Sequence, residues 1–77
     1  MNTQDKIVET LELVFGQPVD PNSHFQRSQV PGWDSIKHLE LVFALEDIFA
    51  IRFDASEVPT LDGLEALCAA VERHLAA

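Results

Sequence analysis

A serine lies where a turn gives way to an apolar helix in the segment PGWDSIKHLELVFALEDIF. The hydroxyl of this residue, Ser35, could cap the helix, receive a covalent group or act as a nucleophile. An Asp-Ser pair before an apolar helix is commonly only a cap. If Asp34 is the cap, Ser35 lies in the first turn with its hydroxyl outward. A phosphodiester attached there would be favoured by the free N–H groups and the helix dipole, with Lys37 as one added cation.

Ser35 and His38 are spaced i, i+3, with Asp34 beside them, which is the residue set of a catalytic serine. Such catalysis needs the imidazole to reach the serine oxygen, and an oxyanion hole to complete the site. The glycines of the Gly-x-Ser-x-Gly nucleophile elbow are replaced here by Trp33 and Lys37. The sequence therefore disfavours a hydrolase, and we expect no catalytic residues.

Two metal-binding motifs, for calcium and for zinc, are incomplete in this sequence. Asp20, Asn22 and His24 follow the first positions of a calcium-binding EF-hand loop. Phe25 stands where the loop needs glycine, and Pro31 where it needs a closing glutamate. One cysteine and three scattered histidines give no zinc-ligand spacing. We expect no metal site.

The apolar spacing predicts helices that would position Ser35 within an all-α fold. Asn2 or Thr3 can cap the first helix, and Gly16 can end it. Asp62 and Glu65 resemble a capping box for the last one. We expect a small antiparallel four-helix bundle, with main helices at Thr3–Phe15, Ser35–Phe49 and Leu61–Leu75 and a short helical turn at Ala55–Val58 that Pro59 ends.

A long connection, from Gln17 to Gly32, precedes the serine and is rich in Pro, Asn, Ser and Gln. A loop of this length is uncommon in a compact domain and often functional. Phe25 and Val30 are its expected anchors in the core. Trp33 is expected to pack the loop against the bundle, and His38 either to pack against Trp33 or to line an entrance for cargo.

Composition limits the function classes. The 77 residues make one small domain, and 13 acidic against 5 basic side chains give a net charge of −8. This balance excludes a basic footprint for nucleic acid. It suits docking onto basic protein surfaces, although solubility alone explains it equally well.

The single cysteine, Cys68, cannot form an internal disulfide, which favours a reducing compartment. It is expected to be a core thiol, whereas His24 and His74 are expected to be solvated. The polar start from Met1 to Lys6 shows no signal peptide, and no apolar run is long enough to span a membrane. We therefore expect a soluble, cytoplasmic monomer.

The middle helix carries two apolar faces when residues are placed about 100° apart. One face should lie in the core and contains Leu41, Val42, Leu45, Ile48 and Phe49. The opposite face contains Ile36, Glu40, Phe43 and Asp47. These four are either ordinary surface residues or a docking surface, with apolar anchors and carboxylates that select a basic partner.

The segments GWDSI (32–36), LELV (39–42) and ALEDIF (44–49) resemble the phosphopantetheine attachment region of acyl carrier proteins. The resemblance extends over essentially the whole chain and includes the long first loop and the helix after Pro59. It implies an acyl-carrier-like four-helix fold with residues 1–77 as a single carrier domain, and a carrier rather than an enzyme.

The resemblance also implies a cofactor and partners. A phosphopantetheinyl transferase would attach 4'-phosphopantetheine from coenzyme A to Ser35, and the thiol of that arm would hold an acyl group as a thioester. Asp34 would help the transferase and its metal ion position the serine. Ile36, Glu40, Phe43 and Asp47 would form the recognition helix, and the bundle interior could shelter short acyl chains.

Several positions depart from the pattern of fatty-acid carriers. Ile36 replaces the usual leucine, Lys37 and Ile48 stand where acidic residues are usual, and Trp33 is more typical of secondary pathways. We therefore expect a stand-alone acyl carrier for a polyketide, mixed peptide or lipid-type biosynthetic pathway, served by acyl- or aminoacyl-loading and tailoring enzymes. A peptidyl carrier using the same arm, or an unmodified helical adaptor, are the alternatives.

Overall fold

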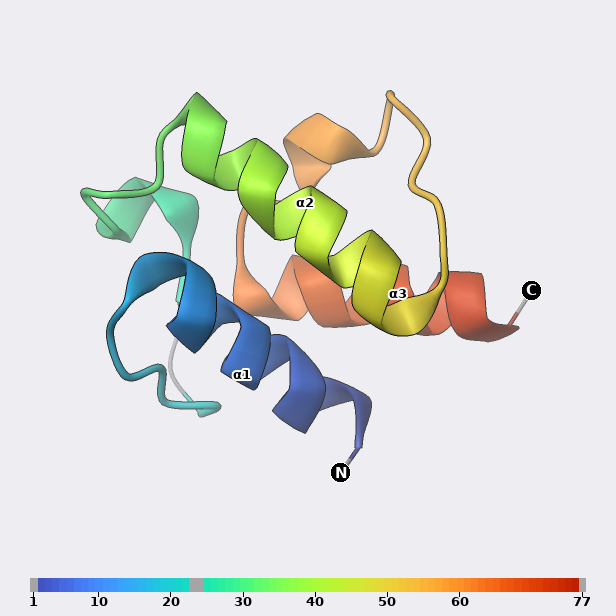
Figure 1. Cartoon of the computed structure of the whole chain (residues 1–77), viewed down its shortest axis with the longest axis horizontal. Coiled ribbons are helices and arrows are strands. Elements are labelled where there is room, and N and C mark those ends of the chain that lie inside the picture. Colours follow the sequence, from blue (N-terminus) through green and yellow to red (C-terminus); the bar gives the residue numbers. More distant parts are fainter. Residues whose placement is uncertain (1, 23–24, 77) are drawn as a thin grey trace.

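Three α-helices form the body of the protein in the computed structural model, which describes residues 2–22 and 25–76 (Figure 1). Within these ranges no β-strand occurs, and the only sheet-like pairing is one isolated bridge between Gln26 and Gly63. The predicted all-α class is therefore confirmed. The elements in chain order are α1 (Thr3–Phe15), the 3-10 helix η1 (Arg27–Gln29), α2 (Ser35–Phe49), the 3-10 helix η2 (Val58–Thr60) and α3 (Leu64–Ala76).

The first two α-helices begin and end at the residues that the sequence predicts, because local caps define them. The side chain of Asn2 accepts a hydrogen bond from the Asp5 amide at 2.8 Å, which caps α1. Gly16 ends α1 in the left-handed conformation, with φ of 66°. Ala50 ends α2 in the same conformation, with φ of 54°.

The third helix begins later than predicted, at Leu64 rather than Leu61. Backbone pairing with the first loop holds the preceding residues: the Leu64 amide donates to the Phe25 carbonyl at 2.8 Å. A Cβ at Gly63 would lie 3.1 Å from the Phe25 oxygen, so this close approach favours glycine. The proposed capping box is therefore wrong, because Asp62 lies two residues before the helix and not at its N-cap.

The expected fourth helix is present only as one 3-10 turn. The prediction placed a turn at Ala55–Val58 and ended it at Pro59, whereas η2 runs over Val58–Thr60 and includes the proline. Proline is tolerated there because the first turn of a helix does not use its N–H groups. The structure thus has three α-helices and two single 3-10 turns among its described residues.

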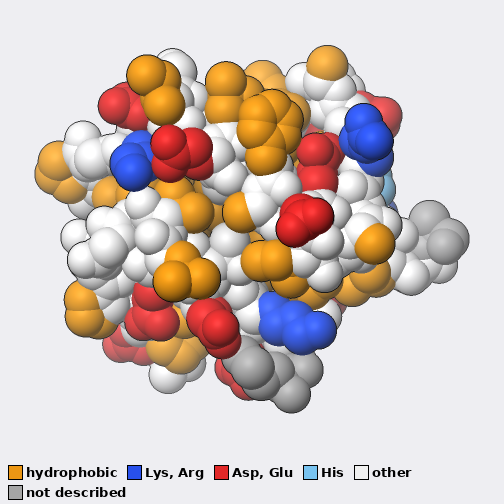
Figure 2. Space-filling view, in the orientation of Figure 1, with side chains coloured by type: hydrophobic (Ala, Val, Ile, Leu, Met, Phe, Trp, Pro, Cys, Tyr) orange, Lys and Arg blue, Asp and Glu red, His pale blue; other side chains and the backbone are white. Residues whose placement is uncertain are grey.

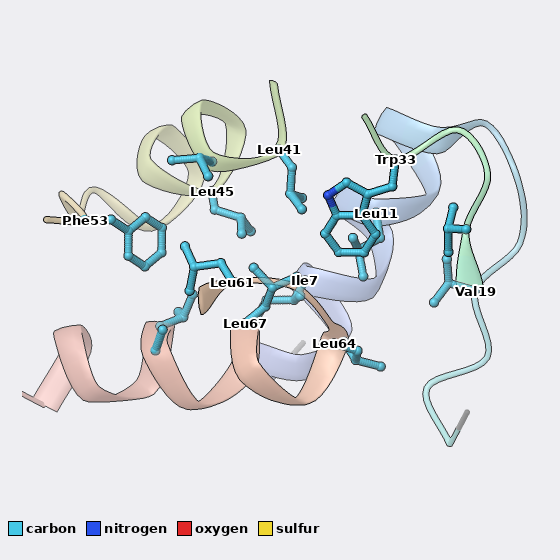
Figure 3. Close-up of a cluster of buried hydrophobic side chains, with 14 residues drawn as sticks. Ile7, Leu11, Val19, Trp33, Leu41, Leu45, Phe53, Leu61, Leu64 and Leu67 are labelled. Atoms are coloured by element: carbon cyan, nitrogen blue, oxygen red, sulfur yellow. The ribbon is translucent and has the colours of Figure 1, made fainter. Parts of the chain in front are cut away.

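Helix α1 packs against both α2 and α3, and α1 and α2 run side by side in opposite directions (Figure 1). Leu41 and Leu45 of α2 point into the buried cluster, with Phe53 at one end and Trp33 at the other (Figure 3). Both predicted loop anchors join this core, Val30 as a buried and Phe25 as a half-buried side chain. The fully buried large side chains are Ile7, Leu11, Leu41, Leu45, Leu61, Leu67 and Val71.

The buried face of α2 is narrower than predicted. Ile48 was expected in the core but is 45% exposed, and Phe49 is only half-buried. At about 100° per residue, Ile48 lies roughly 60° around the helix from Leu45, at the edge of the face that packs on α1. Leu75 is also exposed, in the last turn of α3, although it follows the apolar spacing.

A charged cluster ties the connection after α2 to the end of α3. The carboxylate of Glu57 accepts hydrogen bonds from the Asp54 amide at 2.9 Å, Arg73 Nη2 at 2.6 Å and His74 Nε2 at 2.8 Å. The His74 ring stands edge-on to Phe53, with ring centroids 5.2 Å apart. His74 is thus half-buried and paired, so its predicted solvation is wrong; His24 lies outside the described residues.

We expect Leu45→Ala to lower the free energy of unfolding by about 2–4 kcal/mol, because the substitution leaves a cavity around a fully buried side chain. Urea unfolding measures the change. Leu13→Ala makes the same chemical change at a side chain that is 76% exposed, and should cost under about 0.5 kcal/mol. A neutral Leu45→Ala would show that the faces of α2 are assigned the wrong way round.

Hydrogen bonds from the Asp54 amide, His74 and Arg73 lower the pKa of Glu57 from its ordinary value of 4.5 to about 2. A lowered folded-state pKa means that this contribution to stability is complete above about pH 4.5 and is lost as the pH falls toward 2. We therefore expect Glu57→Gln to lose less stability than the wild type across that window. Urea unfolding at several pH values tests this, and parallel losses in the two proteins would contradict it.

Candidate functional site

The start of α2 presents Ser35 as an outward residue with a free hydroxyl. Asp34 is the N-cap: its Oδ1 accepts from the Lys37 amide at 2.9 Å, and its extended backbone leads into the helix. Ser35 is the first helical residue and is exposed. No described residue hydrogen-bonds to its side chain. The aspartate therefore does the capping, and the serine hydroxyl remains available for chemistry.

The end of the first loop is fixed just before this serine. The Trp33 amide donates to the Val30 carbonyl at 3.0 Å, and Arg27 Nε donates to the Trp33 carbonyl at 3.3 Å. The indole ring packs against Phe15 and Phe25, with ring centroids 5.0 Å and 5.9 Å away. Trp33 is thus held in place immediately before Asp34 and Ser35. The predicted packing of the tryptophan against the bundle is confirmed.

The indole of Trp33 donates a hydrogen bond from Nε1 to His38 Nδ1 at 2.9 Å. The other ring nitrogen, Nε2, lies 2.7 Å from the Val58 carbonyl. An indole N–H only donates and a carbonyl only accepts, so His38 carries its proton on Nε2. Both rings are only 4% exposed. The structure therefore favours packing of His38 against Trp33, and the imidazole is not free to act as a base for Ser35.

Lys37 was predicted to add a cationic contact near Ser35, but its ammonium group makes other contacts. Its Nζ lies 3.3 Å from the Val14 carbonyl, near the end of α1, and 3.4 Å from Glu40 Oε2. A cation at the C-terminal end of a helix is favoured by the helix dipole. The ammonium therefore links α1 to α2 and is engaged there rather than at the Ser35 hydroxyl.

One face of α2, here called the outer face, continues from Ser35 along the helix. Ile36 is 69% and Phe43 62% exposed, and Glu40 and Asp47 are also exposed, as the spacing predicts. Their role in recognition stays a prediction. The outer face is thus defined by Ile36, Leu39, Glu40, Phe43 and Asp47.

Leu39 belongs to the outer face and was missed in the sequence. Its side chain is 48% exposed, and it lies four residues after Ser35 and four before Phe43. Residues four apart are neighbours on a helix surface, so the spacing alone could have placed Leu39 on the same face as Phe43. An exposed apolar strip therefore begins next to the serine and consists of Ile36, Leu39 and Phe43.

The outer face is less acidic than its sequence indicates, because the Glu40 carboxylate is paired with Lys37. Figure 2 shows hydrophobic and acidic side chains mixed over the side of the molecule on which α2 lies, not a continuous acidic field. A partner docking there would meet apolar groups as well as charge.

One groove in the described part of the chain lies away from this site. It has a volume of about 630 Å³ and lies between the N-terminal part of α1, the first loop and α3, and no residue of α2 lines it. The half-buried Cys68 packs against the core and lines the groove, and burial raises the pKa of its thiol. The groove is thus not positioned beside Ser35.

No family model and no curated protein matches this chain. Among the described residues, no group of three or more His, Cys, Asp or Glu side chains could hold a metal ion. The helices described are also too short or too polar for any to cross a membrane. Functional interpretation therefore depends on the residues of the site itself.

We expect Phe43→Ala to slow reaction with a partner enzyme while shifting Tm by less than about 2 °C, because the ring is mostly exposed. Glu40→Lys should also slow the reaction, since it reverses a charge on the outer face. Turnover with the phosphopantetheinyl transferase that the sequence resemblance implies, together with thermal unfolding, measures the two effects. Glu40→Gln serves as a control that removes the Lys37 ion pair without adding a cation; unfolding of the Phe43 variant would contradict this assignment.

Proposed function

We propose that this protein is an acyl carrier, which holds acyl intermediates as thioesters on a 4'-phosphopantetheine arm attached to Ser35. One observation carries the proposal: Asp34 caps α2, so the serine hydroxyl is exposed and unengaged at an ordered helix start. The three α-helices and η2 would then form the four-helix carrier arrangement.

The attachment reaction suits this geometry. The Ser35 oxygen would attack the phosphorus that bears the pantetheine, the bond from that phosphorus to the leaving 3',5'-ADP would break, and the hydroxyl proton would pass to a base of the transferase. The product is a phosphodiester at a helix N-terminus, where the dipole favours negative charge. Asp34 directly precedes the serine, and its carboxylate would contribute an oxygen ligand to the magnesium ion of the transferase.

The partners would approach the outer face of α2. Its apolar residues continue directly from Ser35, so an enzyme bound there would receive the tethered cargo in its active site. Those partners would be the transferase and the acyl- or aminoacyl-loading and tailoring enzymes of a polyketide, mixed peptide or lipid-type pathway. We propose that the carrier is monomeric and cytoplasmic, in agreement with its single cysteine.

A second candidate, an unmodified helical adaptor, is favoured by the same apolar residues. Ile36, Leu39 and Phe43 are each about half-exposed or more on one face. Such a face can bind a partner protein without any covalent group. The two candidates differ in whether function requires the Ser35 hydroxyl.

We expect the wild type to gain the mass of one phosphopantetheinyl unit after incubation with coenzyme A and a broad-specificity transferase, and Ser35→Ala to gain none. Ser56→Ala, at another exposed serine, should gain the unit like the wild type. Intact-protein mass spectrometry measures all three proteins. No gain in the wild type would overturn the carrier proposal in favour of the adaptor, and a gain in Ser35→Ala would place the attachment elsewhere.

A further inference from the structure

We propose that His38 is a positioning residue for the modification of Ser35, acting through Trp33. This inference rests on the proposed carrier function but assigns a role to a buried residue that the function itself does not require. The imidazole makes its hydrogen bonds to Trp33 and Val58, not to the serine. Its effect would come from holding the two residues that precede the serine.

His38 contacts both of those residues. Its backbone amide donates to the Asp34 carbonyl at 2.9 Å, and its Nδ1 accepts the Trp33 indole hydrogen at 2.9 Å. The chain from Trp33 to His38 is therefore closed by a backbone bond and a side-chain bond, with Ser35 inside the closed segment. Loss of the bond from Trp33 would leave the backbone bond and the Asp34 cap on the Lys37 amide, neither of which holds the indole of Trp33.

The third contact of His38 fixes the imidazole itself. Nε2–H donates to the Val58 carbonyl at 2.7 Å, in η2. A ring with hydrogen bonds at both nitrogens has a defined tautomer and orientation. This bond to η2, 20 residues beyond His38, therefore helps to fix the position of Trp33 and of the start of α2.

Such positioning matters because attachment requires the serine oxygen to align with a phosphorus atom held by another enzyme. Misplacement of a reacting group by about 1 Å can cost about a hundredfold in rate. The outer face lies on the other side of α2 from His38, which is buried. Loss of the bond should therefore lower kcat of the transferase and leave its KM for this carrier nearly unchanged.

Two substitutions at His38 separate positioning from general stability. His38→Asn places an oxygen where Nδ1 accepts from Trp33, whereas His38→Leu, of similar size, offers no acceptor. Both variants leave buried polar groups unpaired: His38→Leu leaves the indole N–H and the Val58 carbonyl, and His38→Asn leaves its own amide hydrogens. Both should therefore lose stability, and if His38 only filled space, activity would follow the measured stability of each variant and not the presence of an acceptor for the indole.

The test is steady-state phosphopantetheinylation of the apo protein, with folding checked by circular dichroism. We expect kcat to fall at least about tenfold in His38→Leu and to stay within about threefold of wild type in His38→Asn, with KM within about twofold in both. Trp33→Phe keeps an aromatic ring but removes the N–H, and should lose kcat like the leucine variant. It keeps the inference testable if His38→Leu does not fold.

Leu45→Ala is the matched control, because it removes a buried side chain of the same helix outside this hydrogen-bonded set. Its kcat should equal that of the wild type at a temperature where it is folded. Unchanged kcat in Trp33→Phe and in the folded His38 variants, or an equal loss in Leu45→Ala, would overturn the positioning role while the carrier function stands. Failure of the wild type to accept the group would overturn the carrier function itself.

Discussion

The hydrogen bond from the Trp33 indole to His38 connects the parts of the molecule that meet at Ser35. It joins the end of the first loop to the first turn of α2, and the second nitrogen of the same imidazole joins α2 to η2. Both rings are buried, so each polar group needs this partner. The exposed serine therefore lies next to two buried side chains, Trp33 and His38, whose ring nitrogens are all hydrogen-bonded.

Helix α2 has a buried side and an exposed outer face. Leu41, Val42 and Leu45 are buried in the core, while Ile36 and Phe43 lie on the outer face beyond the serine. Burial of the first set supplies stability, whereas the second set contributes little to the fold of the isolated chain. This separation would let a partner bind the outer face without disturbing the core that holds Ser35.

The features that could be predicted from the sequence are those that local interactions determine. The caps of α1 and α2 and the outward position of Ser35 follow from residues within one turn of each other. The later start of α3 and the pairing of His74 with Glu57 depend on contacts between distant segments, which spacing along one helix does not reveal. Packing of His38 against Trp33 was one of the two roles that the sequence left open, and the bond to Val58 depends on a contact 20 residues away.

The protonation of the His38 ring tests this account most directly. Long-range 15N–1H correlation NMR distinguishes a ring nitrogen that carries hydrogen from one that does not. The account predicts a single species with hydrogen on Nε2 and a bare Nδ1 that couples to a slowly exchanging Trp33 indole hydrogen. Hydrogen on Nδ1, or averaging between the two tautomers, would contradict it, because neither state lets Nδ1 accept the indole hydrogen throughout.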